Sequence, residues 1–254
     1  MEEEFTPIEE KKISIFDTFV NLLTAPTELF STIVKGENRA SNYFVPIIAS
    51  IIAGIIFIFI VFSQPSIQYQ QQEMQNNAMQ QMVADGKMTA EQFESAVENN
   101  PAKPGSPMFM VFGSIGILIG SFAILFLLVL ILWIVGKIAF SSQAKYLKTT
   151  EVVGLSSYVT VIGSFVTLIF VLGFDSLFAG PNLAIFVNEF DIKNKIHLLL
   201  KSIDILMIWY LYILSIGLSA LWETNKIKSV ATVFSLWGIY LLITIYFGMK
   251  FAGS

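Results

Sequence analysis

The sequence contains no cysteine among its 254 residues and only one histidine, His197. The absence of cysteine excludes disulfides, cysteine-ligated zinc and thiol catalysis. Glu189 and Asp191 lie near the histidine, but a surface loop of mixed charge accounts for such a group better than a metal site does. The sequence also lacks a phosphate-binding loop, a GxSxG elbow, an HExxH motif and paired carboxylates in an apolar segment. We therefore expect no cofactor, no metal and no enzymatic activity.

Charged residues are scarce as well, at 13% of the chain, and the net charge is −4. The positive charges are scattered and form no basic stripe, so no nucleic-acid partner is expected. Hydrophobic residues make up 55% of the chain, and the mean hydropathy is +0.70. These values exceed those of ordinary soluble domains. The lipid bilayer is therefore the expected partner.

Uninterrupted apolar runs of about 20 residues, the length that crosses a bilayer as a helix, occur five times. Only helices satisfy the backbone of a single segment in lipid, so an all-α membrane protein with five transmembrane helices in a bundle is predicted. The bundle forms one membrane domain, residues 43–254, and a polar loop, residues 63–107, interrupts it. The predicted spans are residues 43–62, 108–136, 152–173, 203–222 and 230–249.

Lysine and arginine are enriched on the cytoplasmic side of membrane proteins. With five spans, nine of the fifteen basic residues fall on the N-terminal side, against six on the other side. We therefore expect a cytoplasmic N-terminus and an outside C-terminus. A secretory signal is not expected, because the first apolar run begins only at Tyr43. The short loops on the cytoplasmic side are predicted to face anionic lipid or a protein partner through Lys145, Lys148, Lys226 and Lys228.

The cytoplasmic segment, residues 1–42, contains an amphipathic pattern over residues 14–34. Pro26 does not fit a helix interior, so the pattern predicts two short helices, the second beginning near Pro26. Their apolar face either packs on the bundle or lies in the membrane interface beside the first span. The predicted interfacial anchor is formed by Phe16, Phe19, Leu23, Pro26 and Phe30.

The polar loop begins with a glutamine-rich run, and Thr89 to Gln92 reads as a capping box before a second short helix. The piece "DGKMTAEQF" resembles half of a calcium-binding loop. With Gly86 at the sixth position, however, the first, third and twelfth positions are Gln81, Val83 and Gln92, so most carboxylate ligands are missing. A helical hairpin on the outer surface is predicted.

Two predicted spans carry polar side chains on one face. Such residues let helices pack closely, and a packing seam is the favoured interpretation because no span has a centrally placed charge. The alternative is a polar path for a small solute, as in a transporter or channel. Asp204 begins the fourth span, where it is expected to cap the helix. The polar faces comprise Ser156, Thr160, Gly163, Ser164, Thr167, Asp204, Ser215 and Ser219.

The amphipathic "LLTAPTELFSTI", the five spans, "TEVVGLSSYVTVIGSF" and "SIDILMIWYLYILSIGLSALWETNKIKSVATVF" together resemble the Yip family of polytopic membrane proteins. The resemblance implies a five-helix bundle with a cytosolic N-terminus, and for eukaryotic members a role in membrane traffic through Ypt/Rab GTPases. In the third span Ser157 to Ile162 departs from the eukaryotic pattern, which ends in a proline. The chain looks more similar to bacterial members, and a bacterial inner membrane is the implied location.

The predicted function is therefore that of a non-enzymatic integral membrane protein that organises membrane or binds protein partners, a second copy of the chain included.

Overall fold

The computed structural model describes residues 14–188 and 190–252, which are mostly α-helical, so the predicted all-α class is confirmed. Lys11, Lys12 and Glu189 lie outside the described residues. The helices are α1 (Ile15–Thr24), α2 (Pro26–Lys35), α3 (Ser41–Val61), α4 (Pro65–Ala84), α5 (Ala90–Glu98), α6 (Pro107–Phe140), α7 (Tyr146–Ser156), α8 (Tyr158–Phe174), the 3-10 turn η1 (Leu183–Phe186), α9 (Lys195–Ser202), α10 (Ile205–Leu221) and α11 (Lys226–Ala252).

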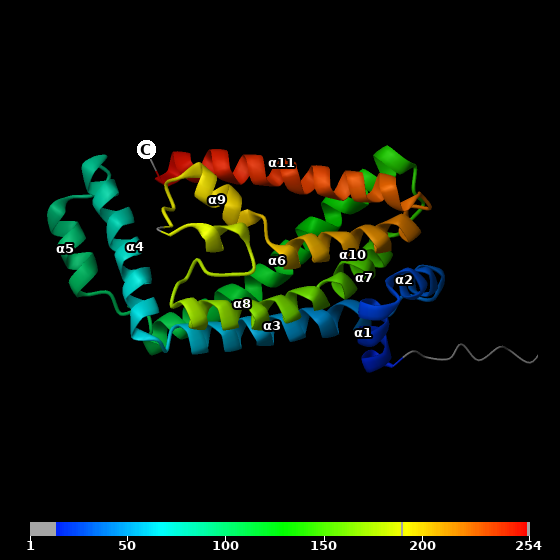
Figure 1. Ribbon diagram of the computed structural model, residues 1–254, viewed down its shortest axis with the longest axis horizontal. Coiled ribbons are helices and arrows are strands. Elements are labelled where there is room, and N and C mark those ends of the chain that lie inside the picture. The colour runs from blue at the N-terminus through cyan, green and yellow to red at the C-terminus, as the bar shows by residue number, and fades with distance from the viewer. Residues whose placement is uncertain (1–13, 189, 253–254) are drawn as a thin grey trace, which may run out of the picture.

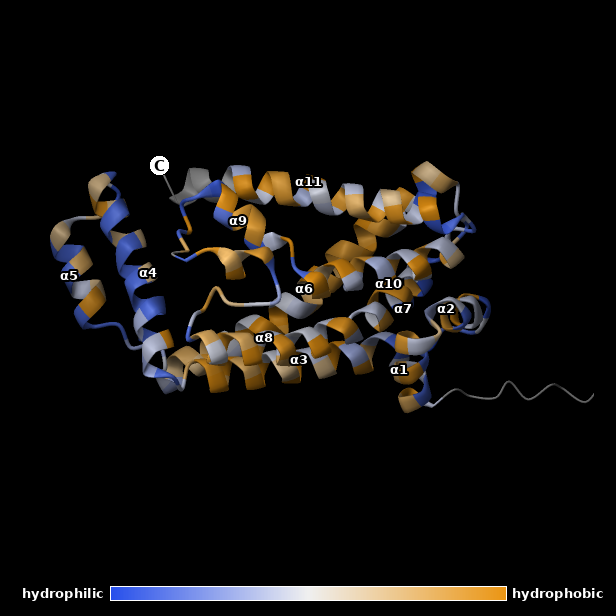
Figure 2. Cartoon of the chain, in the orientation of Figure 1, coloured by the Kyte–Doolittle hydropathy of each residue, from blue (hydrophilic) through white to orange (hydrophobic). Residues whose placement is uncertain are grey.

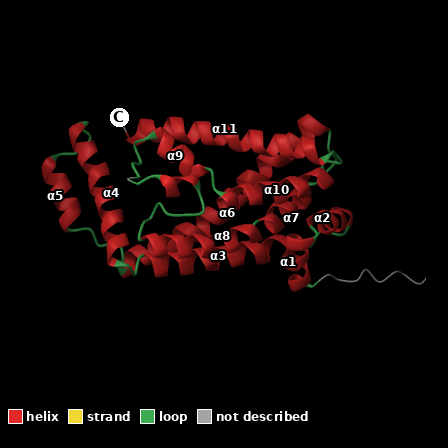
Figure 3. Ribbon diagram, viewed as in Figure 1, coloured by secondary structure: helices red, strands yellow, loops and turns green. Residues whose placement is uncertain are grey.

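The long helices α3, α6, α7–α8, α10 and α11 run along the long axis of the molecule (Figure 1). Helices α1 and α2 lie at one end, together with the α6–α7 and α10–α11 connections. We call this end the α2 end. Helices α4, α5 and α9 lie at the opposite end with the last turns of α11, and a long loop that contains η1 joins α8 to α9 there (Figure 3). We call this opposite end the α9 end.

Among the described residues, four helical stretches are long and apolar enough to cross a membrane: Ser41–Val61, Pro107–Phe140, Tyr146–Phe174 and Lys226–Tyr246. They appear as predominantly orange ribbons, in contrast to the blue glutamine-rich α4 (Figure 2). The third stretch combines α7 and α8. Helix α10, which covers the predicted fourth span, has 17 residues and is shorter than these four stretches.

Helix α10 lies in the interior of the bundle, where it packs against α2, α7, α8 and α11. Most of its second half is buried, and Leu214 and Leu218 are at most 1% exposed. Gly217 permits this packing, because a Cβ atom there would lie 2.6 Å from Val152 and 2.9 Å from Phe30. The close approach of three helices therefore depends on a residue without a side chain.

The third predicted span, residues 152–173, differs from the structure in two ways. The helix begins earlier, at Tyr146, and it is interrupted at Ser157 between α7 and α8. Ser157 donates from its hydroxyl to the Gly154 carbonyl at 2.6 Å, and Thr160 donates to the Ser157 carbonyl at 2.6 Å. Hydroxyls that bond to preceding carbonyls compete with the helical ladder and bend helices. The prediction missed this break because apolar run length does not register such bonds.

Gly154 and the Gly116–Gly120 pair differ in how closely a neighbouring helix approaches them. At Gly154 of α7 a Cβ atom would clash with the Cα and Cβ atoms of Tyr43, so α3 and α7 cross at this residue. The Gly116–Gly120 pair of α6 has no atom within 4 Å of either added Cβ. Of these glycines, Gly154 is therefore the one at a close helix crossing. Gly116 and Gly120, which form a GxxxG pattern, are not at a crossing within the chain.

The polar segment forms the hairpin α4–α5, and the predicted capping box of Thr89 and Gln92 is confirmed. The base of the hairpin is attached to the end of α8. Gln70 donates to the Asp175 carbonyl at 2.8 Å and accepts from the Leu177 N–H at 3.1 Å. The hairpin therefore has a fixed base at the α9 end.

Replacing Gly154 with Ala is expected to lower the free energy of unfolding by about 1–3 kcal/mol, because the added methyl group meets the α3 backbone. Gly116→Ala is the matched control, since alanine favours a helix by up to about 1 kcal/mol over glycine and meets no neighbour there. Thermal unfolding in detergent, followed by circular dichroism, measures both. A Gly154→Ala protein as stable as the wild type would contradict the close crossing.

Candidate functional site

The two helices that precede the first long helix begin and end at identifiable residues. Ser14 caps α1 by accepting from the Asp17 N–H at 3.0 Å. Ala25 interrupts the helix, and α2 begins at Pro26 as predicted. Proline fits a first helical position because its missing N–H has no partner there anyway. The two helices therefore follow from local sequence.

Helix α2 turns its apolar face into the bundle. Leu29, Phe30 and Ile33 are buried, and Phe30 is completely enclosed. Its ring lies against the open space that Gly217 leaves on α10. This position corrects the assignment of Phe30 to the interfacial anchor. The helical wheel identified the apolar face correctly, but only the packing shows that the bundle covers it.

Helix α1 has both an inward and an outward apolar surface. Leu22 is buried, and the Phe19 ring makes an edge contact with Tyr158, with ring centroids 5.2 Å apart. Phe16 is 72% exposed and Ile15 is 54% exposed. Leu23 and Pro26 are half-buried. Of the five predicted anchor residues, Phe16 is thus the one that faces fully outward.

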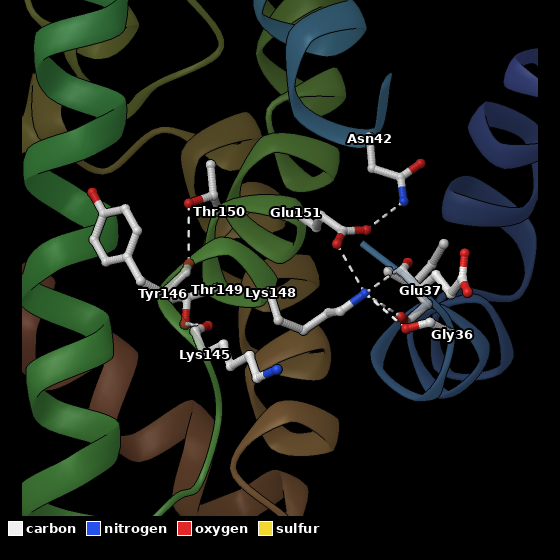
Figure 4. A network of polar contacts seen from close by, with 10 residues as sticks. Gly36, Glu37, Asn42, Lys145, Tyr146, Lys148, Thr149, Thr150 and Glu151 are labelled. Carbon is white, nitrogen blue, oxygen red and sulfur yellow. Dashed lines mark hydrogen bonds and ion pairs between the residues drawn. The ribbon is translucent and has the colours of Figure 1, made fainter. Parts of the chain in front are cut away.

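A buried lysine joins α2 to α7 (Figure 4). The Lys148 ammonium donates to the carbonyls of Ile33, Gly36 and Glu37 at 3.0 to 3.1 Å. Carbonyls at the C-terminal end of a helix lack partners within the helix and carry partial negative charge. Lys148 therefore supplies both the hydrogen bonds and the positive charge that the end of α2 requires.

Glu151, one turn further along α7, completes this polar network (Figure 4). Its carboxylate pairs with Lys148 at 2.8 Å and accepts from the Asn42 side chain at 2.6 Å. Glu151 is 1% exposed. A carboxylate so deeply buried is tolerated only when it is paired and hydrogen-bonded. The network therefore holds α2, α3 and α7 in one arrangement.

Lys148 does not belong to an outward-facing basic group as predicted, because it is buried and bonded within the protein. The other three lysines of that group are exposed at the α2 end. Lys226 donates to the Thr27 hydroxyl at 2.9 Å and so reaches α2 from the start of α11. Lys145 and Lys228 remain available to lipid or to a partner.

The sequence reasoning missed Glu151 and Asn42 because both lie just outside the predicted spans. A signal was nevertheless present. Glu151 directly precedes an apolar run and follows Lys148 by three residues, a spacing that brings two side chains together on a helix.

The predicted polar faces consist largely of hydroxyls bonded within their own helices. Ser156 and Ser215 are fully buried and donate to the Val152 and Leu211 carbonyls. Thr160 also lies 3.0 Å from the Ser50 hydroxyl of α3. These bonds fit a packing seam, and the transporter alternative stays a prediction. The remaining members, Gly163, Ser164 and Thr167, are half-buried on α8, and Ser219 is buried on α10.

Asp204 caps α10 as predicted, accepting from the N–H groups of Leu206 and Met207 at 2.7 and 3.1 Å. His197 accepts the Asp191 N–H at 3.0 Å through Nδ1. Across residues 14–188 and 190–252, no group of three or more acidic or histidine side chains is arranged to hold a metal ion.

Among known protein families, the model of the Yip1 domain matches residues 20–247 of the chain. The chain belongs to the Yip1 domain family. The predicted resemblance is thereby confirmed, and with the apolar helices it identifies a multi-pass integral membrane protein. No curated protein and no solved structure matches the chain. The matched region of the Yip1 domain includes the whole network around Lys148.

Lys148→Ala is expected to lower the free energy of unfolding by about 3–5 kcal/mol, because it leaves Glu151 buried without its partner. Lys145→Ala is the matched control, since Lys145 is exposed three residues earlier and its loss should cost at most about 0.5 kcal/mol. Melting of the two proteins in the same detergent compares these effects. Equal melting temperatures would show that the network does not support the fold.

Proposed function

We propose that this Yip1-domain protein is a non-enzymatic membrane organiser that presents α1 at the cytoplasmic membrane surface. The single observation that carries the proposal is the difference between the two N-terminal helices in their packing and exposure. Helix α2 is locked into the bundle by Lys148, whereas α1 exposes Ile15 and Phe16. A large apolar side chain held at the end of a membrane bundle fits the boundary between headgroups and acyl chains.

The exposed lysines support the same proposal. Lys145, Lys226 and Lys228 lie at the end that carries α1, and each lysine near an anionic surface contributes about 1 kcal/mol of attraction. Apolar insertion and electrostatic attraction then act on the same membrane face. Protein partners with acidic surfaces, or a second copy of the chain, would meet this face as well.

We further propose that α10 is a fifth membrane helix. Its 17 residues extend about 25 Å, slightly less than the hydrocarbon core. Because α10 is surrounded by other helices over much of its length, little of its backbone needs to meet lipid. Five crossings leave α1 and the exposed lysines on the cytoplasmic side, in agreement with the distribution of basic residues. The C-terminus then lies outside.

The proposed topology predicts which engineered cysteines are reached from outside. The chain has no native cysteine, so each single variant carries one thiol. In sealed right-side-out vesicles, a membrane-impermeant maleimide should label Lys87→Cys in the hairpin. Asn225→Cys, in the α10–α11 turn, should react only after permeabilisation. Labelling of both without permeabilisation would contradict a fifth crossing.

The interfacial position of α1 is tested by Phe16→Cys with a nitroxide label, in the full-length protein reconstituted into liposomes. Collisions with oxygen, which partitions into lipid, should exceed collisions with a water-soluble nickel chelate. Asp17→Cys is the matched control on the neighbouring exposed position and should show the opposite preference. Nickel access at residue 16 equal to that at residue 17 would place the Phe16 side chain in water and refute the anchor.

A further inference from the structure

A second surface with lipid-binding features lies at the opposite end of the molecule, between α9 and α11. A groove of about 430 Å³ lies beside the contact between the two helices, and its lining residues are Lys195 of α9 and Leu242, Ile243, Ile245 and Tyr246 of α11. The groove is shallow, because Leu242, Ile243 and Tyr246 are 71%, 50% and 57% exposed. The walls are almost wholly apolar, and Lys195 supplies the one cationic group among the lining residues.

The position of the groove is that of a bilayer boundary. Helix α9 ends two residues before Asp204, which caps α10, and the facing wall belongs to the later turns of α11 (Figure 1). The groove residues of α11 fall within its membrane candidate, Lys226–Tyr246, and the helix continues beyond them to Ala252. Tyrosine is enriched at such boundaries because its ring has an apolar body and a polar tip.

Helix α9 itself has the character of an interfacial helix. Ile196 is 66% exposed and Leu199 is 44% exposed, and their spacing of three residues places them on the same face. Lys195 is exposed beside them and forms no ion pair or hydrogen bond through its ammonium within residues 14–188 and 190–252. Apolar side chains and a lysine on one short helix are features of helices that lie on anionic membranes.

The other lysine of α9, Lys201, contacts aromatic rings within the protein. The Lys201 ammonium lies over the rings of Phe178 and Phe190, at 4.7 and 5.7 Å from their centroids. Burial lowers the pKa of Lys201, which disfavours its use as a surface charge. Lys195 is therefore the cation of this helix that is free to meet a ligand at the groove.

We propose that the α9–α11 groove binds one anionic phospholipid. An acyl chain lies along Leu242, Ile243 and Tyr246, and the phosphate of the headgroup meets the Lys195 ammonium. The combination of one cation with otherwise apolar lining residues favours an anionic lipid over a zwitterionic one. The site is separate from the α2 end, so this proposal does not depend on the proposed role of α1.

The test uses the full-length protein in a non-ionic detergent. Dioleoyl phosphatidylglycerol or dioleoyl phosphatidylcholine is added, and native mass spectrometry measures the affinity for the first bound lipid. The wild type should prefer phosphatidylglycerol. Lys195→Ala should weaken phosphatidylglycerol binding about fivefold and phosphatidylcholine binding less, because the choline ammonium offsets the charge of the phosphate. Lys195→Arg should retain the preference.

Two controls make the result specific. Lys103→Ala removes the same charge from an exposed position in the α5–α6 connection, outside the groove lining, and should not affect the first lipid. Ile243→Trp fills the groove and should weaken both lipids. Equal behaviour of Lys195→Ala and Lys103→Ala, or equal binding of the two lipids by the wild type, would overturn the proposal. The proposal would also be overturned if the wild type formed a dimer that Ile243→Trp abolishes and showed no lipid preference. A second copy of the chain would then occupy the groove.

Discussion

The arrangement of the α2 end depends on one buried ammonium group. Lys148 lies within 3.1 Å of three carbonyls at the end of α2 and of the Glu151 carboxylate. Neither the helix end nor the carboxylate would be stable in an apolar interior alone. Because each satisfies the other through the same lysine, α2 is held at a fixed place on the bundle. The position of α1, which follows from that of α2, is then fixed as well.

Apolar run length and helical periodicity were sufficient for the helical class, the position of the long helices and the break at Pro26. These features are local, and each is set by a few neighbouring residues. The break at Ser157 was not predictable in this way. The length of an apolar run does not show whether a hydroxyl within it donates to a preceding backbone carbonyl. The sequence also could not decide between bundle and lipid for Phe30, since both surroundings favour the same residue.

The polar network shows why candidate sites are harder to predict than helices. Lys148 and Glu151 are neighbours on α7, but Asn42 lies 109 residues before Glu151 and meets it only where α3 and α7 cross at Gly154. The boundaries of the apolar runs placed Lys148 in a cytoplasmic loop, where a lysine is usually exposed. Asp204 was assigned correctly as a helix cap because capping involves only its own next three residues.

The long sequence separation within the network has a consequence for biosynthesis. Lys148 contacts carbonyls that precede it by 111 to 115 residues. At synthesis rates of about 5–20 residues per second, the end of α2 is synthesised roughly 6 to 23 seconds before Lys148. During that interval the apolar face of α2, with Phe30, has no α7 or α10 to cover it. A nascent chain therefore has to shelter this face against the membrane surface or a chaperone until the third long helix arrives.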